Sequence, residues 1–164
     1  MWGTYREDMP LEGEYDESPV PWVRDQVALY ERTGGREGNT LRDTGLPIAL
    51  FTIRKRRNGH LRKVPLMRVE HDGKYLLVAS KGGAPKNPVW YYSLTEHPEI
   101  EVQDGPEPFD AVVRELHAAE RAEWWERAVA AFPNYAEYQR RTDREIPVFL
   151  AERVSMDAAD SGLA

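Results

Sequence analysis

The sequence predicts an α+β fold, in which a small antiparallel barrel of about six strands carries peripheral helices. Three observations lead to this fold class. Extended segments follow one another through tight turns, and the dipeptides Asn58-Gly59 and Asp72-Gly73 are strong hairpin signals. The other periodic segments have helical spacing and lie outside these hairpins. At 164 residues, the chain has the length of one ordinary domain with a continuous core.

The first predicted element is a helix that starts near Ser18, before Pro21, and ends at the pair Gly34-Gly35. The side chains that share its apolar face are Trp22, Val23, Gln26, Val27 and Tyr30. Beyond this helix, the spacing of apolar residues is no longer helical. Three meandering antiparallel strands are expected over residues 46–54, 61–70 and 74–80. We expect the helix to pack against these strands.

The second half of the chain is predicted to contain three more helices and three more strands. Pro88 suits the first turn of a helix that runs through His97, and Pro98 ends it. At most one of the adjacent Trp124 and Trp125 can point fully inward, so both are assigned to packing. The remaining predicted elements are strands over 99–103 and 109–116, helices over 118–131 and 134–141, and a closing strand over 146–151.

The charge of the chain is unevenly distributed. It has 22 Lys and Arg against 28 Asp and Glu, a formal net charge of −6, and six of the acidic side chains lie in residues 1–20. In contrast, residues 54–63 (RKRRNGHLRK) hold six basic and no acidic side chains. Positive potential is therefore concentrated at the first hairpin turn, where an anion is the natural partner.

Three regions are expected along the chain. Residues 1–18 and 155–164 lack apolar periodicity, so an acidic flexible arm and a flexible C-terminus are predicted around a folded domain of residues 19–154. The sequence has no cysteine, no secretory signal and no apolar run long enough to span a bilayer. These features indicate a cytoplasmic protein.

Missing motifs disfavour several classes of enzyme. The sequence contains no G-x-G-x-x-G after a strand, no P-loop and no G-x-S-x-G nucleophile elbow, which argues against dinucleotide folds and serine hydrolases. The four histidines, His60, His71, His97 and His117, have no metal-ligand spacing. We therefore expect no bound metal.

The basic turn is one candidate anion site. Arg56, Arg57 and Arg62 flank its glycine, and guanidinium groups bind phosphate or carboxylate with two hydrogen bonds. A solvated hairpin tip is equally consistent with this turn taken alone. Nucleic acid is a competing anion, but a duplex binder usually spreads positive charge over a whole face. A small anionic ligand is therefore preferred over nucleic acid.

The segment SKGGAPKNPVW is a second candidate site. Ser80, Lys81 and Lys86 lie near backbone amides that lead into a helix N-terminus, an arrangement that suits an anion. An ordinary glycine-rich connection has the same composition. Together with the basic turn, the segment favours one long ligand with several negative groups, and an aromatic side chain of the following helix could form a wall against a planar ring.

Tyr135 and Tyr138 lie three residues apart in the predicted helix over 134–141. This spacing puts both phenols on one face of that helix. From spacing alone, two amphipathic tyrosines at the edge of a core are the more frequent arrangement.

The chain resembles the deazaflavin-dependent nitroreductase family in two runs, GLPIALFTIRKRRNGHLRKVPLMRVEHDGKYLLVASKGGAPKNPVWYYSL and FPNYAEYQRRTDREIPVFL. The similarity covers about residues 21–153. It implies a split β-barrel of the FMN-binding type and a reduced coenzyme F-420 (F420, an 8-hydroxy-5-deazaflavin) as the hydride donor. It also implies an electron-poor acceptor such as a quinone, a nitroaromatic compound or an activated enone.

The resemblance also implies roles for individual residues. Those at the phosphate and acidic tail of the cofactor would be Arg56, Arg57, Asn58 and Arg62. The other implied cofactor-binding residues are Pro65, Ser80, Lys81, Gly82, Gly83, Lys86, Pro88 and Trp90. The implied catalytic residues are Ser80, Tyr135 and Tyr138. This sequence departs from the family pattern at Lys55, where a glycine is usual, and at Ser93, where asparagine is common.

Other functions remain open on the sequence. An FMN-dependent split-barrel oxidoreductase would need a site for only one phosphate, and a carrier would bind deazaflavin without turning it over. A nucleic-acid module is the least favoured alternative. The expected partners are a small-molecule acceptor and, for a homodimer, a second copy of the chain. A lipid quinone as acceptor would add a peripheral membrane contact.

Overall fold

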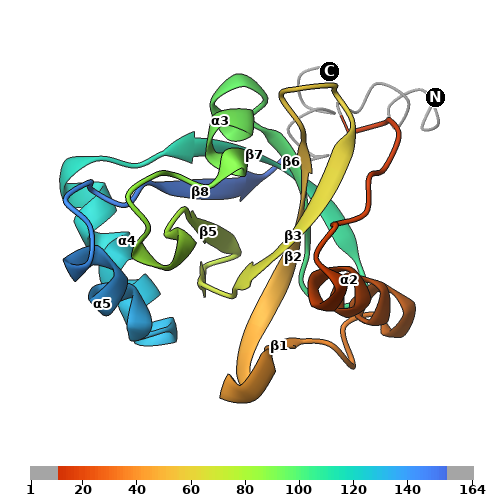
Figure 1. Ribbon diagram of the computed structural model, residues 1–164, viewed down its shortest axis with the longest axis horizontal. Helices are drawn as coiled ribbons and strands as arrows, with labels where there is room; N and C mark the ends of the chain where they lie inside the picture. The colour runs from red at the N-terminus through yellow and green to blue at the C-terminus, as the bar shows by residue number, and fades with distance from the viewer. Residues whose placement is uncertain (1–10, 155–164) are drawn as a thin grey trace.

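The structure is built on a curled antiparallel sheet with helices around it (Figure 1). The computed structural model describes residues 11–154. The strand order is β1-β2-β6-β7-β8-β5-β4, and β3 pairs with β2 outside this path. The strands are β1 (Thr40–Leu41), β2 (Leu46–Arg54), β3 (Leu61–Met67), β4 (Glu70–His71), β5 (Lys74–Val78), β6 (Glu99–Gln103), β7 (Pro108–Glu115) and β8 (Val148–Arg153).

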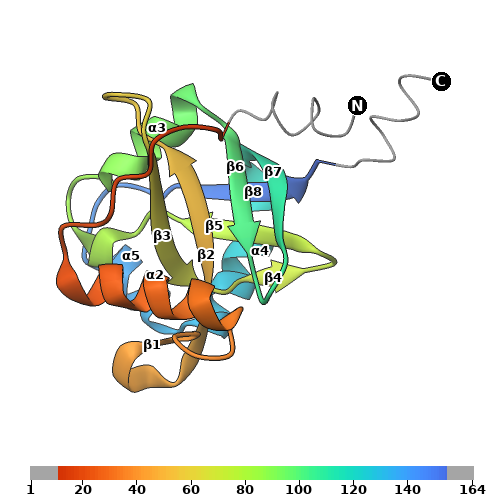
Figure 2. The same ribbon diagram turned by 90° about the vertical axis from the view of Figure 1, so that its right-hand side faces the viewer.

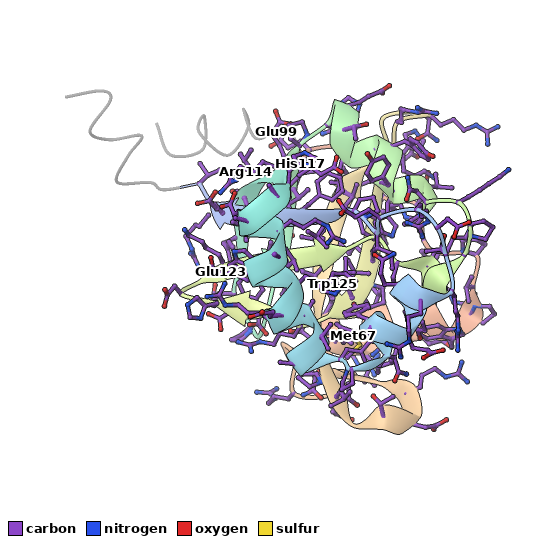
Figure 3. The ribbon with its side chains drawn as sticks, turned by 90° about the vertical axis from the view of Figure 1, so that its left-hand side faces the viewer. Met67, Glu99, Arg114, His117, Glu123 and Trp125 are labelled. Carbon is purple, nitrogen blue, oxygen red and sulfur yellow. The ribbon has the colours of Figure 1, made fainter. Side chains whose placement is uncertain are left out.

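The helices lie at two ends and along one side of the sheet. They are α2 (Pro21–Thr33), α3 (Val89–Glu96), α4 (Ala118–Ala131) and α5 (Asn134–Arg140). Helices α4 and α5 lie together at one end, and α2 crosses β2 and β3 at the other (Figures 1 and 2). Trp124 is buried, whereas Trp125 lies beside α5 with its ring 6.3 Å from that of Tyr135 (Figure 3). Within residues 11–154, no helix is long and apolar enough to cross a membrane.

Strand β2 is buried on both faces and separates two hydrophobic clusters. Ile48 and Leu50 contact the cluster that includes residues of α2, α4 and α5. Phe51 and Ile53 contact the opposite cluster, which includes Trp90 of α3. Because side chains alternate along a strand, a single continuous apolar run supplies both clusters.

The predicted strand over 61–70 is interrupted, and this corrects the expected three-strand meander. The chain turns at Arg68 and Val69, where the N–H of Arg68 donates to Pro47 of β2 and the carbonyl of Val69 accepts from Leu76 of β5. Beyond this corner, β5 pairs with β8 and not with β3. The buried side chain of Val69 and the Arg68–Asp104 hydrogen bond of 2.8 Å hold the corner in place.

The other predicted elements agree closely with the structure. The predicted ranges 46–54, 99–103 and 118–131 match β2, β6 and α4, and Gly34 has the left-handed conformation expected at the end of α2. Several element ends differ from the prediction by one or two residues. Val20 is the residue before the first turn of α2, and the side chain of Ser18 accepts a hydrogen bond from it instead of capping the helix. Strand β8 starts two residues later than expected, and the short strand β1 was not predicted.

The described part of the expected flexible arm lies along the outer edge of β3 (Figure 1). Leu61 donates its N–H to the carbonyl of Glu14 and accepts from the N–H of Asp16, at 2.7 and 2.8 Å. Tyr15 therefore forms a parallel bridge with Leu61. Backbone hydrogen bonds need no apolar periodicity, which explains why the sequence pattern did not indicate this contact. The expectations for residues 1–10 and 155–164 lie outside the described residues.

Candidate active site

Two adjoining pockets open beside β3, one toward the segment that follows β5 and the other toward α3. The first, called the apolar pocket, has a volume of about 630 Å³. Its walls come from β3, from the 80–82 segment, from the start of α3, from α5 and from α2; among its residues are Pro65, Met67, Ser80, Lys81, Gly82, Pro88, Trp90, Phe132, Tyr135, Tyr138, Trp22, Val23 and Gln26. It is thus enclosed by segments that are far apart in the sequence.

The second pocket, called the basic pocket, has a volume of about 600 Å³ and lies at the hairpin between β2 and β3. The charged side chains that line it are Asp16, Glu17, Lys55, Arg56, Arg57, Arg62 and Lys63. Arg62, Lys63, Val89, Val20 and Ser18 belong to both pockets. The two pockets therefore form one groove with an apolar half and a cationic half.

The conformation of the hairpin tip is set by backbone bonds around Gly59. Lys55 donates its N–H to the carbonyl of His60 at 2.7 Å and accepts from the N–H of Gly59 at 3.0 Å. Gly59 has a φ of 75°, which favours glycine. The side-chain oxygen of Asn58 accepts from the N–H of His60, so Asn58 stabilises the turn and is not among the residues that line either pocket.

Three cations of the basic pocket have carboxylate neighbours. The Nζ of Lys55 lies 2.7 Å from Asp16, and this hydrogen bond lowers the pKa of the Asp16 carboxyl. Lys63 pairs with Glu31 of α2. Arg56 lies 4.0 Å from Glu96, which is only a marginal contact. These pairs offset part of the positive charge without removing it.

Arg57 and Arg62 have no such partner within residues 11–154. Arg62 is half-buried, and its desolvation lowers the pKa of its guanidinium from the usual value. A partly buried cation without a counter-ion is costly, and an anionic ligand offsets that cost. Arg62 lies where the two pockets join, so a negative group is favoured at this junction.

Within the described residues, more contacts restrain Arg56 than Arg57. Its N–H donates to the hydroxyl of Ser93 at 3.3 Å, and its guanidinium lies 5.5 Å from the centre of the Tyr92 ring. Ser93, one of the two departures from the family pattern, therefore lies in the basic pocket and supports the hairpin. It does not line the apolar pocket.

The segment after β5 has an unusual backbone. Lys81, Gly82 and Gly83 have φ values of 46°, 63° and 79°, so three successive residues are left-handed. Ser80, Lys81 and Gly82 line the apolar pocket. Gly83 is buried against α5 instead, and the exposed side chain of Lys86 lies outside the residues that line the two pockets.

Tyr135 and Tyr138 are brought together on the inner face of α5, with ring centres 6.2 Å apart. Tyr135 is 4% exposed, and its burial, with a smaller contribution from Tyr138, raises the pKa of its phenol well above the usual range. The phenol therefore keeps its proton and is a hydrogen-bond donor at neutral pH. Among the described residues, neither hydroxyl has a hydrogen-bond partner, and both side chains line the apolar pocket.

Sequence reasoning did not assign the α2 side of the apolar pocket to the site. Trp22, Val23 and Gln26 were interpreted as residues that pack against the barrel, but they also line the pocket. The side-chain amide of Gln26 donates to the carbonyls of Gly38 and Thr40, at 3.0 and 2.8 Å, which ties α2 to β1. Helical spacing indicates which face is covered, and it does not indicate whether a cavity lies beneath that face.

The described residues contain no group of three or more His, Asp or Glu that could hold a metal ion. The groove presents mainly guanidinium, ammonium and hydroxyl groups beside an apolar surface, with the carboxylates of Asp16 and Glu17 in its basic half. Such a groove suits an elongated ligand with a planar apolar end and an anionic end.

The comparison with known families agrees with this geometry. The family model described as F420H(2)-dependent quinone reductase matches residues 22–153. The chain belongs to this family. The match confirms the resemblance to F420-dependent reductases and includes both halves of the groove.

Relatives of known structure or function support the same assignment. The F420H(2)-dependent quinone reductase Rv1261c of Mycobacterium tuberculosis is 33% identical over 137 residues, which cover 82% of this chain and 91% of that protein. A solved F420-H2 dependent reductase, FDR-A, is 54% identical with a TM-score of 0.62, over 65% of this chain and 94% of its own. A solved domain-swapped dimer is 50% identical with a TM-score of 0.64, over 82% and 100% of the two chains. The predicted split-barrel fold is confirmed by these structures.

Replacement of Gly83 by alanine is expected to disturb the groove. A Cβ at Gly83 would lie 2.6 Å from the carbonyl oxygen of Tyr138, at a φ of 79°, so α5 or the segment must move. Gly82→Ala is the matched control, because its φ of 63° is also left-handed and nothing lies within 4 Å. We expect urea denaturation to show a loss of about 1–2 kcal/mol in the free energy of unfolding for the control. Gly83→Ala should lose roughly 1–3 kcal/mol more, and equal losses would contradict a tight contact with α5.

Proposed function

We propose that this protein reduces a quinone with hydride from reduced F420, with both molecules bound in the groove between β3 and α5. Its family is that of F420H(2)-dependent quinone reductases, and the protein is an F420H2-dependent oxidoreductase. The observation that carries the proposal is the junction at Arg62. There, a half-buried guanidinium that has no carboxylate partner among residues 11–154 joins an apolar pocket to a cationic one.

The residues present fit the cofactor. A deazaflavin has a planar ring system at one end and a phosphate with an acidic tail at the other. Pro65, Gly82 and Trp90 would hold the ring in the apolar pocket, and Arg57 and Arg62 would hold the anionic part in the basic pocket. When bound, the reduced cofactor supplies a hydride from a carbon of its ring.

The chain's own contribution is binding, orientation and exclusion of water. The apolar pocket removes water from the reacting groups through Val64, Met67 and Phe132. Val78 of β5 and Ser80 after it also line that pocket, so the acceptor would be confined between β3 and this part of the chain. Such confinement lowers the entropic cost of bringing two reactants together.

Tyr135, Tyr138 and Ser80 are the proposed hydrogen-bond donors to the acceptor. Their hydroxyl groups have no partner within the described residues, and all three side chains line the apolar pocket. A quinone oxygen gains negative charge as hydride arrives at the acceptor, and a phenol that stays protonated can stabilise that charge. A phenol, or a water beside it, would then provide the proton.

The alternatives are less well supported by the groove. FMN has a single phosphate, whereas the basic pocket extends from Arg62 to Arg56 and Arg57 and leaves room for further negative groups. A carrier function would not require, inside the apolar pocket, hydroxyl groups that have no partner among residues 11–154. Asn58, Gly83 and Lys86, which the sequence assigned to cofactor binding, are proposed to act through the conformation of the turns that contain them.

The assembly and the membrane contact are also proposals. A relative that is 50% identical is a domain-swapped dimer, which supports a homodimer for this chain. Val20, Trp22 and Val89 are exposed at the mouth of the apolar pocket, and these apolar side chains suit a peripheral contact with a membrane if the acceptor is a lipid quinone. No binding of nucleic acid is proposed.

The proposed function is tested by titrating the purified protein with oxidised F420, FMN and FAD, and by following ligand fluorescence. We expect micromolar or tighter binding of F420 and weaker binding of FMN and FAD. The protein with reduced F420 is then mixed without oxygen with a soluble benzoquinone. Fast reoxidation of F420 supports a reductase, whereas binding without reoxidation would indicate a carrier, and preferred binding of FMN would support the FMN alternative.

The double variant Arg56→Glu/Arg57→Glu should bind F420 about 10- to 100-fold more weakly, because it loses one or two charge-assisted hydrogen bonds. The loss should shrink as salt concentration rises, since screening weakens the interaction that was removed. Arg36→Glu changes charge at an exposed residue outside both pockets and serves as the control. Fluorescence titrations at low and high salt measure this effect, and unchanged affinity would contradict the basic pocket as the tail site.

The double variant Tyr135→Phe/Tyr138→Phe should keep its affinity for F420 within about twofold, while the turnover number falls about 100-fold, as is typical when a proton donor is removed. Because neither hydroxyl has a partner among the described residues, the variant should fold as stably as the parent. Tyr15→Phe, outside both pockets, is the control. Steady-state kinetics and cofactor titration measure the two effects, and an equal loss of cofactor binding would show that the tyrosines are structural.

A further inference from the structure

We propose that Arg144 is a positioning residue for the cofactor site. Its side chain holds the 79–87 segment in the conformation that binds the cofactor. The inference rests on the proposed function, because that segment is assigned to the cofactor through Ser80, Lys81 and Gly82. Arg144 lies between α5 and β8 and is not among the residues that line either pocket. Its role is therefore to act through the segment and not on the ligand.

The guanidinium of Arg144 donates hydrogen bonds to four oxygens of the 79–87 segment. Its Nε lies 2.9 Å from the carbonyl of Ala84, and its Nη2 lies 2.7 Å from the carbonyl of Ser80. Its Nη1 contacts both the carbonyl of Ala79, at 3.2 Å, and the side-chain oxygen of Asn87, at 2.7 Å. The segment thus curves around one planar group that contacts its start, its middle and its end.

The segment has few bonds of its own that could maintain this shape. Its turn is closed by hydrogen bonds from Gly83 to Ser80 and from Ala84 to Lys81, at 2.9 and 3.1 Å. Lys81 has a φ of 46°, an unfavourable conformation for a residue with a side chain. Bonds from a partly buried cation are stronger than bonds between neutral groups, so Arg144 can stabilise a conformation that the segment would otherwise leave.

Arg144 is itself fixed by α5. Gln139, in the last turn of α5, donates to the carbonyl of Arg144 at 2.8 Å and accepts from the N–H of Ile146 at 3.0 Å. The same helix carries Tyr135 and Tyr138, and the backbone of Tyr138 packs against Gly83. Arg144 therefore links the helix on the acceptor side of the groove to the segment on the cofactor side.

Lysine cannot reproduce this arrangement. Arginine has five N–H groups in a fixed plane, whereas lysine has a single nitrogen that cannot reach oxygens on opposite sides of the curve. Arg144→Lys keeps the positive charge and most of the side-chain volume, so it isolates the geometry of the bonds. Asn87→Ala removes one of the four acceptors and leaves the guanidinium in place, which makes it a milder variant.

The test compares Arg144→Lys, Arg144→Ala and Asn87→Ala with the control Arg140→Ala. Arg140 is a nearby exposed arginine whose ion pair is with Glu137 of its own helix. Three quantities are measured: the affinity for oxidised F420, the rate of tryptic cleavage after Lys81 and Lys86 in the protein without cofactor, and the midpoint of thermal unfolding. Steady-state kinetics with a benzoquinone add the turnover number and the KM for the acceptor.

We expect Arg144→Lys to unfold close to the parent temperature, to bind F420 at least about tenfold more weakly, and to be cut after Lys81 or Lys86 about tenfold faster, in line with the loss of two or more hydrogen bonds. Its turnover number should fall more than its KM for the quinone changes. Asn87→Ala should show smaller changes of the same kind, of about threefold. Arg140→Ala should match the parent in all measurements.

The proposal is overturned if Arg144→Lys binds F420 within twofold of the parent and is cut at the parent rate. It is also overturned if cleavage increases equally along the whole chain, because that would indicate a general loss of stability. If Arg144→Ala does not fold, the lysine and Asn87 variants still decide the question. Should the parent fail to bind F420, the proposed function fails, whereas the cleavage rates without cofactor still show whether Arg144 holds the segment.

Discussion

The groove exists because β3 and β5 do not form hydrogen bonds with each other as neighbouring strands. The chain leaves β3 at the corner formed by Arg68 and Val69, and this corner changes the pairing partner from β2 to β5. Side chains of both strands therefore face a common space instead of meeting across a ladder. Helices α2, α3 and α5 complete the walls of that space, so one change of pairing accounts for the presence and the position of the groove.

Local ion pairs determine which side chains of the groove keep an uncompensated positive charge. Asp16 and Glu31 each pair with a lysine of the basic pocket, and Glu96 lies near Arg56. Among the cations that line the basic pocket, Arg57 and Arg62 have no carboxylate neighbour within residues 11–154. In the proposed complex, a ligand with an anionic tail lies with its uncharged end in the apolar pocket, where the tyrosines of α5 are found. In this proposal, electrostatics determines which end of the ligand meets the hydroxyl groups.

Much of the fold could be predicted from the sequence, because strands and hairpins depend on local patterns. Asn58-Gly59 indicated the hairpin, and the apolar run of β2 indicated a buried strand. The corner at Arg68 was missed because residues 61–70 have a continuous extended pattern. Likewise, the motif SKGGxxKxPxW does not reveal that Gly83 faces α5 while Gly82 faces the pocket. Arg144 gave no signal because most of its acceptors are backbone carbonyls, and all lie more than 50 residues away along the chain.

The short segment around Tyr15 occupies the outer edge of β3, where it takes up backbone groups that would otherwise be unpaired. An exposed strand edge is a template on which another molecule can add a strand. Versions of the chain that start after residue 18 would therefore leave this edge free, and self-association through β3 would compete with correct folding. Residues 14–16 thus cover part of the β3 edge, a role that is separate from any contribution of Asp16 to the basic pocket.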